Sequence, residues 1–213
     1  MDLPGWSRVA AIVLAIALLA LAARRLPWFK LEGDAEARRV LLAATAILAA
    51  MRWFNTDALA GVQLHFLGAA IATLMFGPAF ALWVMAVASV AAWAMGSAWF
   101  GLAPDFLVAG ALPVAMAAAV SRLANRLLPP HLLVYVMANA FFGGALSMGV
   151  STLFKASVSG LLGSGAHQAY LIATIPLMFG EGFFTGAAMA LIVVYRPQWC
   201  SSFDDATYLG RGD

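Results

Sequence analysis

Apolar and polar positions are distributed along this chain in long blocks, without the short period of an amphipathic strand. Seven blocks are almost wholly apolar, and they cover residues 9–23, 40–53, 64–76, 79–94, 106–120, 132–154 and 170–195. Such blocks are typical of membrane helices, which pair their backbone N–H and C=O groups within the segment. The pattern therefore predicts an all-α, polytopic transmembrane bundle of about seven helices.

The third and fourth blocks are separated only by Gly77 and Pro78. This pair is compatible with a kink in one helix or with a turn between two helices. The two blocks together hold about 30 residues, whereas about 20 span the hydrocarbon of a membrane. The length favours a turn. Short or broken membrane helices are tolerated where they line a cavity inside the protein, which makes this region a place to search for a binding site.

Composition agrees with the membrane class, because 64% of the 213 residues are hydrophobic and only 10% are charged. We expect a bundle over residues 1–199 and a short cytoplasmic tail over residues 200–213. The net charge of +2 gives little support for a nucleic-acid partner, since most basic residues fall in short loops. The single cysteine, Cys200, excludes an internal disulfide.

The basic residues predict an orientation, because Lys and Arg favour the cytoplasmic side. With the amino terminus outside and the carboxyl terminus in the cytoplasm, most of them fall inside. The inner set is Arg24, Arg25, Lys30, Arg38, Arg39, Arg122, Arg126, Arg196 and Arg211, and the outer set is Arg8, Arg52 and Lys155. Residues 55–63, 96–105 and 156–168 then form outer connections.

Five candidate metal ligands fall at the outer side under this topology: Met1 with its amine, Asp2, His65, Asp105 and His167. Imidazole, amine and carboxylate groups together suit first-row transition metals such as cobalt, nickel and copper. The simpler interpretation of either histidine is an interfacial, hydrogen-bonded side chain. Both interpretations stay open at this point.

Glu181 stands within an apolar block, where an ionisable side chain needs a partner inside the bundle. It could contact a substrate, or it could accept hydrogen bonds from a neighbouring helix, since Gly180 and Gly182 allow close backbone approach. Asn139, beside several glycines, is first a helix-packing residue and second a cavity-lining one.

Catalytic motifs are absent from the sequence: it has no phosphate-binding loop, no nucleophile elbow and no H-E-x-x-H pair. We therefore expect no enzymatic activity and no permanently bound cofactor. The ten methionines are scattered, so they favour core filling over a copper path. A haem-carrying redox enzyme is a weak third alternative, because the histidines lie at block ends.

Three motifs occur in the order found in one known family. Residues 65–78, HFLGAAIATLMFGP, resemble that family's H-P-T-G-T-G-L-G-A-I-L-F-G-P; residues 181–186, EGFFTG, resemble E-G-[LIF]-[IV]-T; and residues 2–6, DLPGW, resemble P-P-G-W. The chain thus resembles, over nearly its whole length, the CbiM/NikM-type membrane subunits of cobalt and nickel energy-coupling-factor importers. The resemblance implies a permease of the bacterial cytoplasmic membrane.

The resemblance also implies site residues. In that family the amino terminus folds back into the bundle and chelates the ion through its amine and a histidine after the initiator methionine, together with a histidine that matches His65. Here the family's M-H-I-M-E-G opening is shortened to Met1-Asp2-Leu3, and its G-A-N tract is altered to LAPD at residues 102–105. A surviving site would then combine amine, carboxylate and imidazole ligands.

The expected function is capture of a divalent transition metal for uptake, cobalt or nickel first and copper or zinc next. Separate ATPase and transmembrane adaptor subunits would drive it, since the sequence has no phosphate-binding loop. The alternative is a non-transporting membrane scaffold or metalloprotein assembly factor that uses the same bundle to bind a partner.

Overall fold

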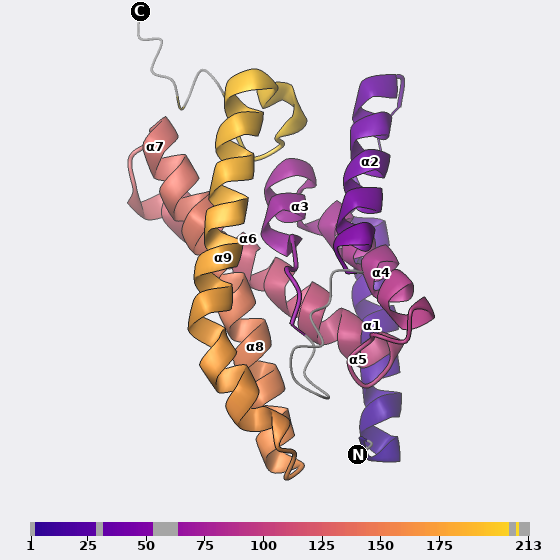
Figure 1. Ribbon diagram of the computed structural model, residues 1–213. Helices are drawn as coiled ribbons and strands as arrows, with labels where there is room; N and C mark the ends of the chain where they lie inside the picture. Colours follow the sequence, from indigo (N-terminus) through magenta and orange to yellow (C-terminus); the bar gives the residue numbers. More distant parts are fainter. Residues whose placement is uncertain (1–2, 29–31, 53–63, 205–207, 209–213) are drawn as a thin grey trace, which may run out of the picture.

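The computed structural model describes residues 3–28, 32–52, 64–204 and 208. This described part is an all-helical bundle, which confirms the expected fold class (Figure 1). The first four helices are α1 (Gly5–Arg24), α2 (Ala35–Met51), α3 (Ala69–Phe76) and α4 (Pro78–Ala94). One continuous helix follows from α5 (Leu102–Phe106), η2 (Leu107–Ala111) and α6 (Leu112–Leu127), and another from α7 (Leu132–Val134), η3 (Tyr135–Phe142) and α8 (Gly143–Leu161). The last elements are α9 (Ala166–Tyr195) and the short turn η4 (Pro197–Trp199).

Among the described residues, four helices are long and apolar enough to cross a membrane, at residues 5–24, 102–127, 132–161 and 166–195. The protein is therefore a multi-pass membrane protein. Helix α4 is shorter, at 17 residues, and α3 has only eight. Eight helical residues rise about 12 Å, less than half of the hydrocarbon thickness, so α3 cannot cross a membrane by itself.

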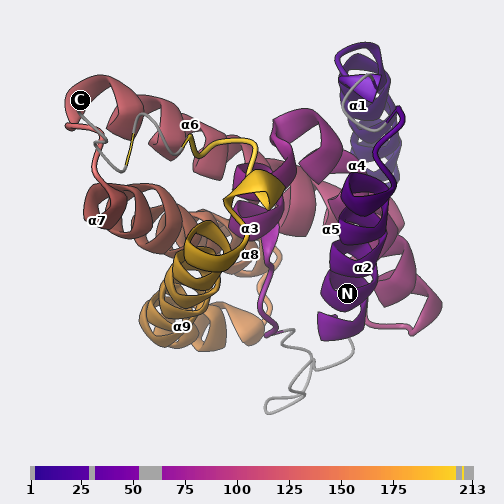
Figure 2. The ribbon, with the colours of Figure 1, turned by 90° about the horizontal axis from the view of Figure 1, so that it is seen from above.

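Helix α3 lies in the middle of the bundle, between the α8–α9 pair and the group formed by α1, α2 and α4 (Figure 2). All residues from 69 to 75 are buried, so this short helix is covered on every side by protein. Gly77, at φ +81°, separates it from α4, whose first residue is Pro78. Pro is favoured at that position because its missing N–H would have no partner in the helix.

Glycines allow α8 and α9 to approach closely along their length. A Cβ atom on Gly182 would lie 2.8 Å from the carbonyl oxygen of Phe141, and one on Gly144 would lie 2.7 Å from Oγ1 of Thr185. A Cβ on Gly180 would lie 2.9 Å from the ring of Phe66, in the segment before α3. Small residues of this kind bring helix backbones together in a membrane.

The connections between helices gather at two ends of the bundle. The start of α1 and the α8–α9 connection lie at one end, and the end of α9, the start of α2 and the α3–α4 turn lie at the other (Figure 1). Which end faces outward stays a prediction. Two connections differ from the expected residues 96–105 and 156–168. The first covers residues 95–101, because α5 begins at Leu102, and the second is much shorter than expected, at residues 162–165, because α8 continues to Leu161 and α9 begins at Ala166.

Residues after α9 turn back and contact α3. The backbone N–H groups of Ser201 and Ser202 donate to the carbonyl oxygens of Met75 and Leu74, at 2.8 and 3.2 Å. The Ser202 hydroxyl also donates to Leu74, at 2.8 Å. Cys200 is a free, buried thiol beside the same helix end. The first residues of the expected tail thus pair the last carbonyl groups of α3, which would otherwise lack partners.

Candidate functional site

An extended segment, residues 65–68, leads into α3 and forms the centre of the candidate site. The chain enters α3 through Gly68 at φ +66°, a conformation that favours glycine. A Cβ atom at Gly68 would also overlap the side chain of Leu48 from α2. The segment can therefore pass close to α2 only because it ends in glycine.

Glu181 pairs the backbone of this extended segment. Its two carboxylate oxygens accept hydrogen bonds from the N–H groups of Leu67, at 2.9 Å, and Gly68, at 2.7 Å. The side chain is fully buried. In a membrane interior no water is present to bond these N–H groups, so α9 supplies the acceptor that the broken helix needs.

A buried ion pair lies next to His65. Arg52, which follows α2, donates from Nη2 to Oδ2 of Asp105 in α5, and both side chains are inaccessible to solvent. The second carboxylate oxygen of Asp105 accepts the backbone N–H of Trp99, at 3.1 Å. Both oxygens of Asp105 are thus already engaged.

His65 is buried between these elements, with 6% of its surface exposed. Its Nδ1 lies 3.2 Å from the carbonyl oxygen of Phe66 and 3.4 Å from Nη1 of Arg52. One ring nitrogen cannot donate to the carbonyl and accept from the guanidinium at once. We assign the proton to Nδ1, because the carbonyl contact is the shorter one. Nε2 then presents a lone pair, and it has no hydrogen-bond partner among the described residues.

Lys155, which comes from α8, is a further buried charged residue of this region and is 3% exposed. Its charge acts on Asp105 and Arg52, and on His65 as well. We call His65, Arg52, Asp105 and Lys155 the ionic cluster. Sequence reasoning treated Arg52 and Lys155 as outer basic residues and missed this role. The missed signal is that both stand within or directly beside an apolar block, where a cation needs a counter-charge.

The remaining candidate residues lie elsewhere. Nδ1 of His167 is 2.9 Å from the carbonyl oxygen of Ala156, and the ring packs against α8 at Gly160. Asn139 is buried and donates to Oδ1 of Asn125 at 2.9 Å, so it joins η3 to α6. Met1 and Asp2 lie outside the described residues, and their part in a metal site stays a prediction.

No group of three His, Cys, Asp or Glu side chains that could hold a metal ion occurs within the described residues. A metal bound at His65 would therefore need further ligands, either from groups that accompany the metal or from Met1 and Asp2. Among the described residues, the ionic cluster alone therefore does not provide a full set of metal ligands. The shortened opening Met1-Asp2-Leu3 likewise lacks a histidine that could add one.

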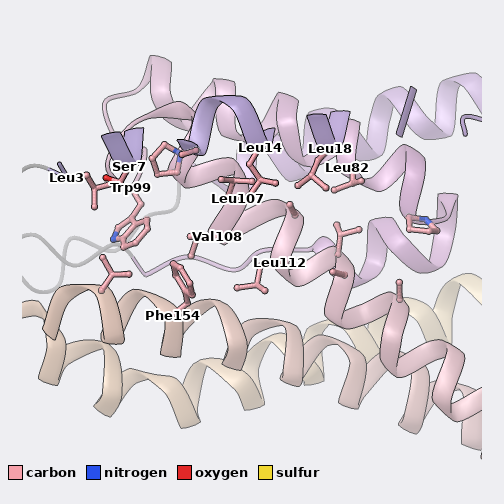
Figure 3. Close-up of a pocket in the computed structure, with 18 of the residues that line it drawn as sticks. Leu3, Ser7, Leu14, Leu18, Leu82, Trp99, Leu107, Val108, Leu112 and Phe154 are labelled. Carbon is pink, nitrogen blue, oxygen red and sulfur yellow. The ribbon is translucent and has the colours of Figure 1, made fainter. Parts of the chain in front are cut away.

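One cavity among the described residues is lined almost wholly by apolar side chains, unlike the ionic cluster. It has a volume of about 670 Å³ and lies between α1 on one side and α8 on the other, with Leu14, Leu18 and Leu112 among the side chains that point into it (Figure 3). Trp99 and Phe154 form one end. Such a lining suits acyl chains or another helix and offers no ligand set for a metal ion.

A family model described as a cobalt uptake substrate-specific transmembrane region matches residues 3–199. No curated protein matches the chain.

Proposed function

The chain belongs to the CbiM family of cobalt uptake substrate-specific transmembrane regions, and from this premise we propose that it captures a divalent transition metal as the permease subunit of an importer. Cobalt is the first candidate for the cargo and nickel the second, with copper and zinc after them. Members of this family are membrane components of transport systems, which is consistent with a location in the bacterial cytoplasmic membrane.

The single observation that carries a metal role for this chain is the state of His65. Its Nε2 is buried without a partner among the described residues, and its Nδ1 faces the carbonyl oxygen of Phe66. Metal-binding histidines commonly donate their second ring N–H to a carbonyl oxygen, which fixes the tautomer and directs the other nitrogen to the metal. Glu181 supports this arrangement by holding the next two residues, Leu67 and Gly68.

Further ligands would come from Met1, through its amine, and from Asp2, which would take the place of the histidine that the family carries after its initiator methionine. Asp105 contributes only if Arg52 moves away, since both carboxylate oxygens are engaged. Energy for uptake would come from separate ATPase subunits through a transmembrane adaptor.

Elemental analysis of the purified protein tests the capture of metal. Wild-type protein dialysed against cobalt or nickel is expected to retain about one equivalent, and His65→Ala is expected to lose it. His131→Ala is the matched control, because His131 is an exposed histidine at the start of α7. Equal metal content in wild type and His65→Ala would remove His65 as a ligand. Absence of an ATPase or adaptor after co-expression and co-purification would refute the coupling.

One observation favours the alternative of a non-transporting scaffold or assembly factor. Within the described residues, Asp105 is already paired with Arg52, whose Nη1 lies 3.4 Å from Nδ1 of His65. A bundle that has lost its metal would keep such a pair for structural reasons. Protein that retains no cobalt, nickel, copper or zinc, yet co-purifies with a membrane metalloenzyme, would support this alternative over uptake.

A further inference from the structure

The apolar cavity between α1 and α8 runs along the helix formed by α5, η2 and α6 (Figure 3). That helix lines it from Val108 to Arg122, which are 14 positions apart, so the cavity follows the helix for about 21 Å. One leaflet of the hydrocarbon core is about 15 Å thick. The cavity is therefore long enough to hold an acyl chain over the depth of a leaflet.

The walls of the apolar cavity come from helices that do not close on one another. Leu14 and Leu18 of α1 lie on one side, and Phe154 of α8 lies on the other. Helix α1 contacts α4 and α5, and only 11% of its membrane-spanning stretch is buried in protein. The hydrocarbon offers no water to fill such a space, and an empty space would lose van der Waals contacts. Lipid is therefore the expected filling.

The volume of the apolar cavity favours an acyl chain over another helix. A membrane-spanning helix of 20 residues is about 30 Å long and about 10 Å wide, which corresponds to a cylinder of about 2,400 Å³. The cavity holds about 670 Å³, less than a third of that volume. A helix cannot enter it without moving α1 away from the bundle, whereas a single flexible chain can.

Arg122 is the one charged side chain among the described residues that line the apolar cavity. It is exposed, lies in the second half of α6 and forms no ion pair with another described residue. In the predicted orientation this end of α6 faces the cytoplasm. Basic pockets between membrane helices on that side bind anionic lipid headgroups, because the cytoplasmic leaflet carries anionic lipids.

We propose that the apolar cavity binds one phospholipid with an anionic headgroup. One acyl chain lies along α6 between α1 and α8, and the headgroup phosphate accepts hydrogen bonds from the guanidinium of Arg122. The lipid fills the space beside α1 and holds this helix to the rest of the bundle. This inference goes beyond metal capture and does not depend on it.

Native mass spectrometry of the full-length protein in detergent tests the inference. Protein washed free of lipid is titrated with phosphatidylglycerol, which is anionic, or with phosphatidylcholine of the same acyl chains, which has no net charge. We expect one phosphatidylglycerol per protein, bound about fivefold more tightly than phosphatidylcholine, the gain that one basic residue gives at an anionic headgroup. Equal affinities for the two lipids, or no bound lipid in either titration, would overturn the proposal.

Two variants of Arg122 test the headgroup contact. Arg122→Gln should lower the affinity for phosphatidylglycerol about fivefold, to that for phosphatidylcholine, whereas Arg122→Lys should keep most of it. Arg196→Gln is the control, because Arg196 follows α9 and does not line the apolar cavity. An unchanged affinity in Arg122→Gln, or an equal loss in Arg196→Gln, would contradict the proposal.

Two tryptophan variants test the place of the acyl chain from different walls of the cavity. Leu112→Trp and Leu14→Trp add volume inside it, and each should lose the bound phosphatidylglycerol. Leu14 is 52% exposed, so its variant is expected to fold even if Leu112→Trp does not. Ile172→Trp, at an exposed position of α9, is the control and should keep the lipid.

Lipid retained in both cavity variants would place it elsewhere on the surface and overturn the proposal. A second copy of the chain, or a co-purified membrane helix, that is bound without lipid and lost in both cavity variants would overturn it as well.

Discussion

Replacement of Glu181 by alanine is expected to weaken the whole bundle, because this side chain pairs two backbone groups in the broken segment before α3. The carboxylate accepts the N–H groups of Leu67 and Gly68 at 2.9 and 2.7 Å. Its side chain has no exposed surface, so no water is placed to take over these hydrogen bonds.

The magnitude follows from the number of N–H groups left unpaired. Each buried donor without an acceptor costs about 1–3 kcal/mol, so Glu181→Ala should lower the free energy of unfolding by about 2–6 kcal/mol. Glu181→Gln keeps one acceptor oxygen and replaces the other with an amide N–H₂. We therefore expect about half of that loss, about 1–3 kcal/mol.

Cys200 provides the assay. It is the single cysteine of the chain and is buried, so a thiol-reactive fluorophore reports unfolding as the protein is heated in detergent. Glu181→Ala should unfold at the lowest temperature, Glu181→Gln at an intermediate one, and wild type at the highest. Glu32→Ala, which removes an exposed carboxylate, is the control and should match wild type.

Equal unfolding temperatures for Glu181→Ala and Glu32→Ala would refute the reasoning, because they would mean that the two N–H groups find other acceptors at no cost. A variant that folds normally but loses metal would instead indicate that Glu181 acts on the cargo. The same thermal assay, combined with elemental analysis, separates these outcomes.

Three further changes test other parts of the structure by thermal unfolding. Gly68→Ala should cost about 2–4 kcal/mol from backbone strain and overlap with α2, whereas Gly33→Ala, at φ +80° in open space, should cost only about 1–2 kcal/mol of strain. Asp105→Asn should cost about 3–5 kcal/mol by leaving the guanidinium of Arg52 unpaired, and an added Arg52→Met change should recover most of it. Ser202→Ala should cost about 1–3 kcal/mol, because it removes the hydrogen bonds that the Ser202 hydroxyl makes with the carbonyl oxygen of Leu74 in α3 and with the hydroxyl of Tyr135.

Each of these has a distinct contrary result. Equal losses in the two glycine variants would mean that contact with α2 is unimportant. A double variant at Arg52 and Asp105 as unstable as Asp105→Asn alone would mean that the unpaired charge is not the cause. An unchanged unfolding temperature for Ser202→Ala would show that the hydroxyl of Ser202 adds no stability.

The helical bundle could be predicted from the sequence because apolar blocks report burial in lipid directly. The turn at Gly77 and Pro78 could also be predicted from the apolar blocks, because the two blocks together were too long for one membrane crossing. Helix lengths were less accessible: helices α5 and α8 continue beyond the apolar blocks into residues that the block boundaries excluded. Interior helices can carry polar residues where protein, and not lipid, surrounds them.

Partners across the bundle could not be predicted. Glu181 invited two interpretations, and only the fold brings it to the N–H groups of Leu67 and Gly68, more than 110 positions earlier in the chain. Arg52 and Asp105 are separated by 53 positions. The sequence placed Arg52 among the outer basic residues and Asp105 among the candidate metal ligands, without pairing the two. Charge counting sorts residues between the two sides of a membrane, but it cannot tell a surface cation from a buried, paired one.

The contacts of α3 have a consequence for synthesis of the chain. Residues before this helix are paired by Glu181, and its last carbonyl groups are paired by Ser201 and Ser202. Both sets of partners leave the ribosome after all the other long helices have been made. The α3 region must therefore remain without these hydrogen bonds until α9 and the residues Ser201 and Ser202 have been made.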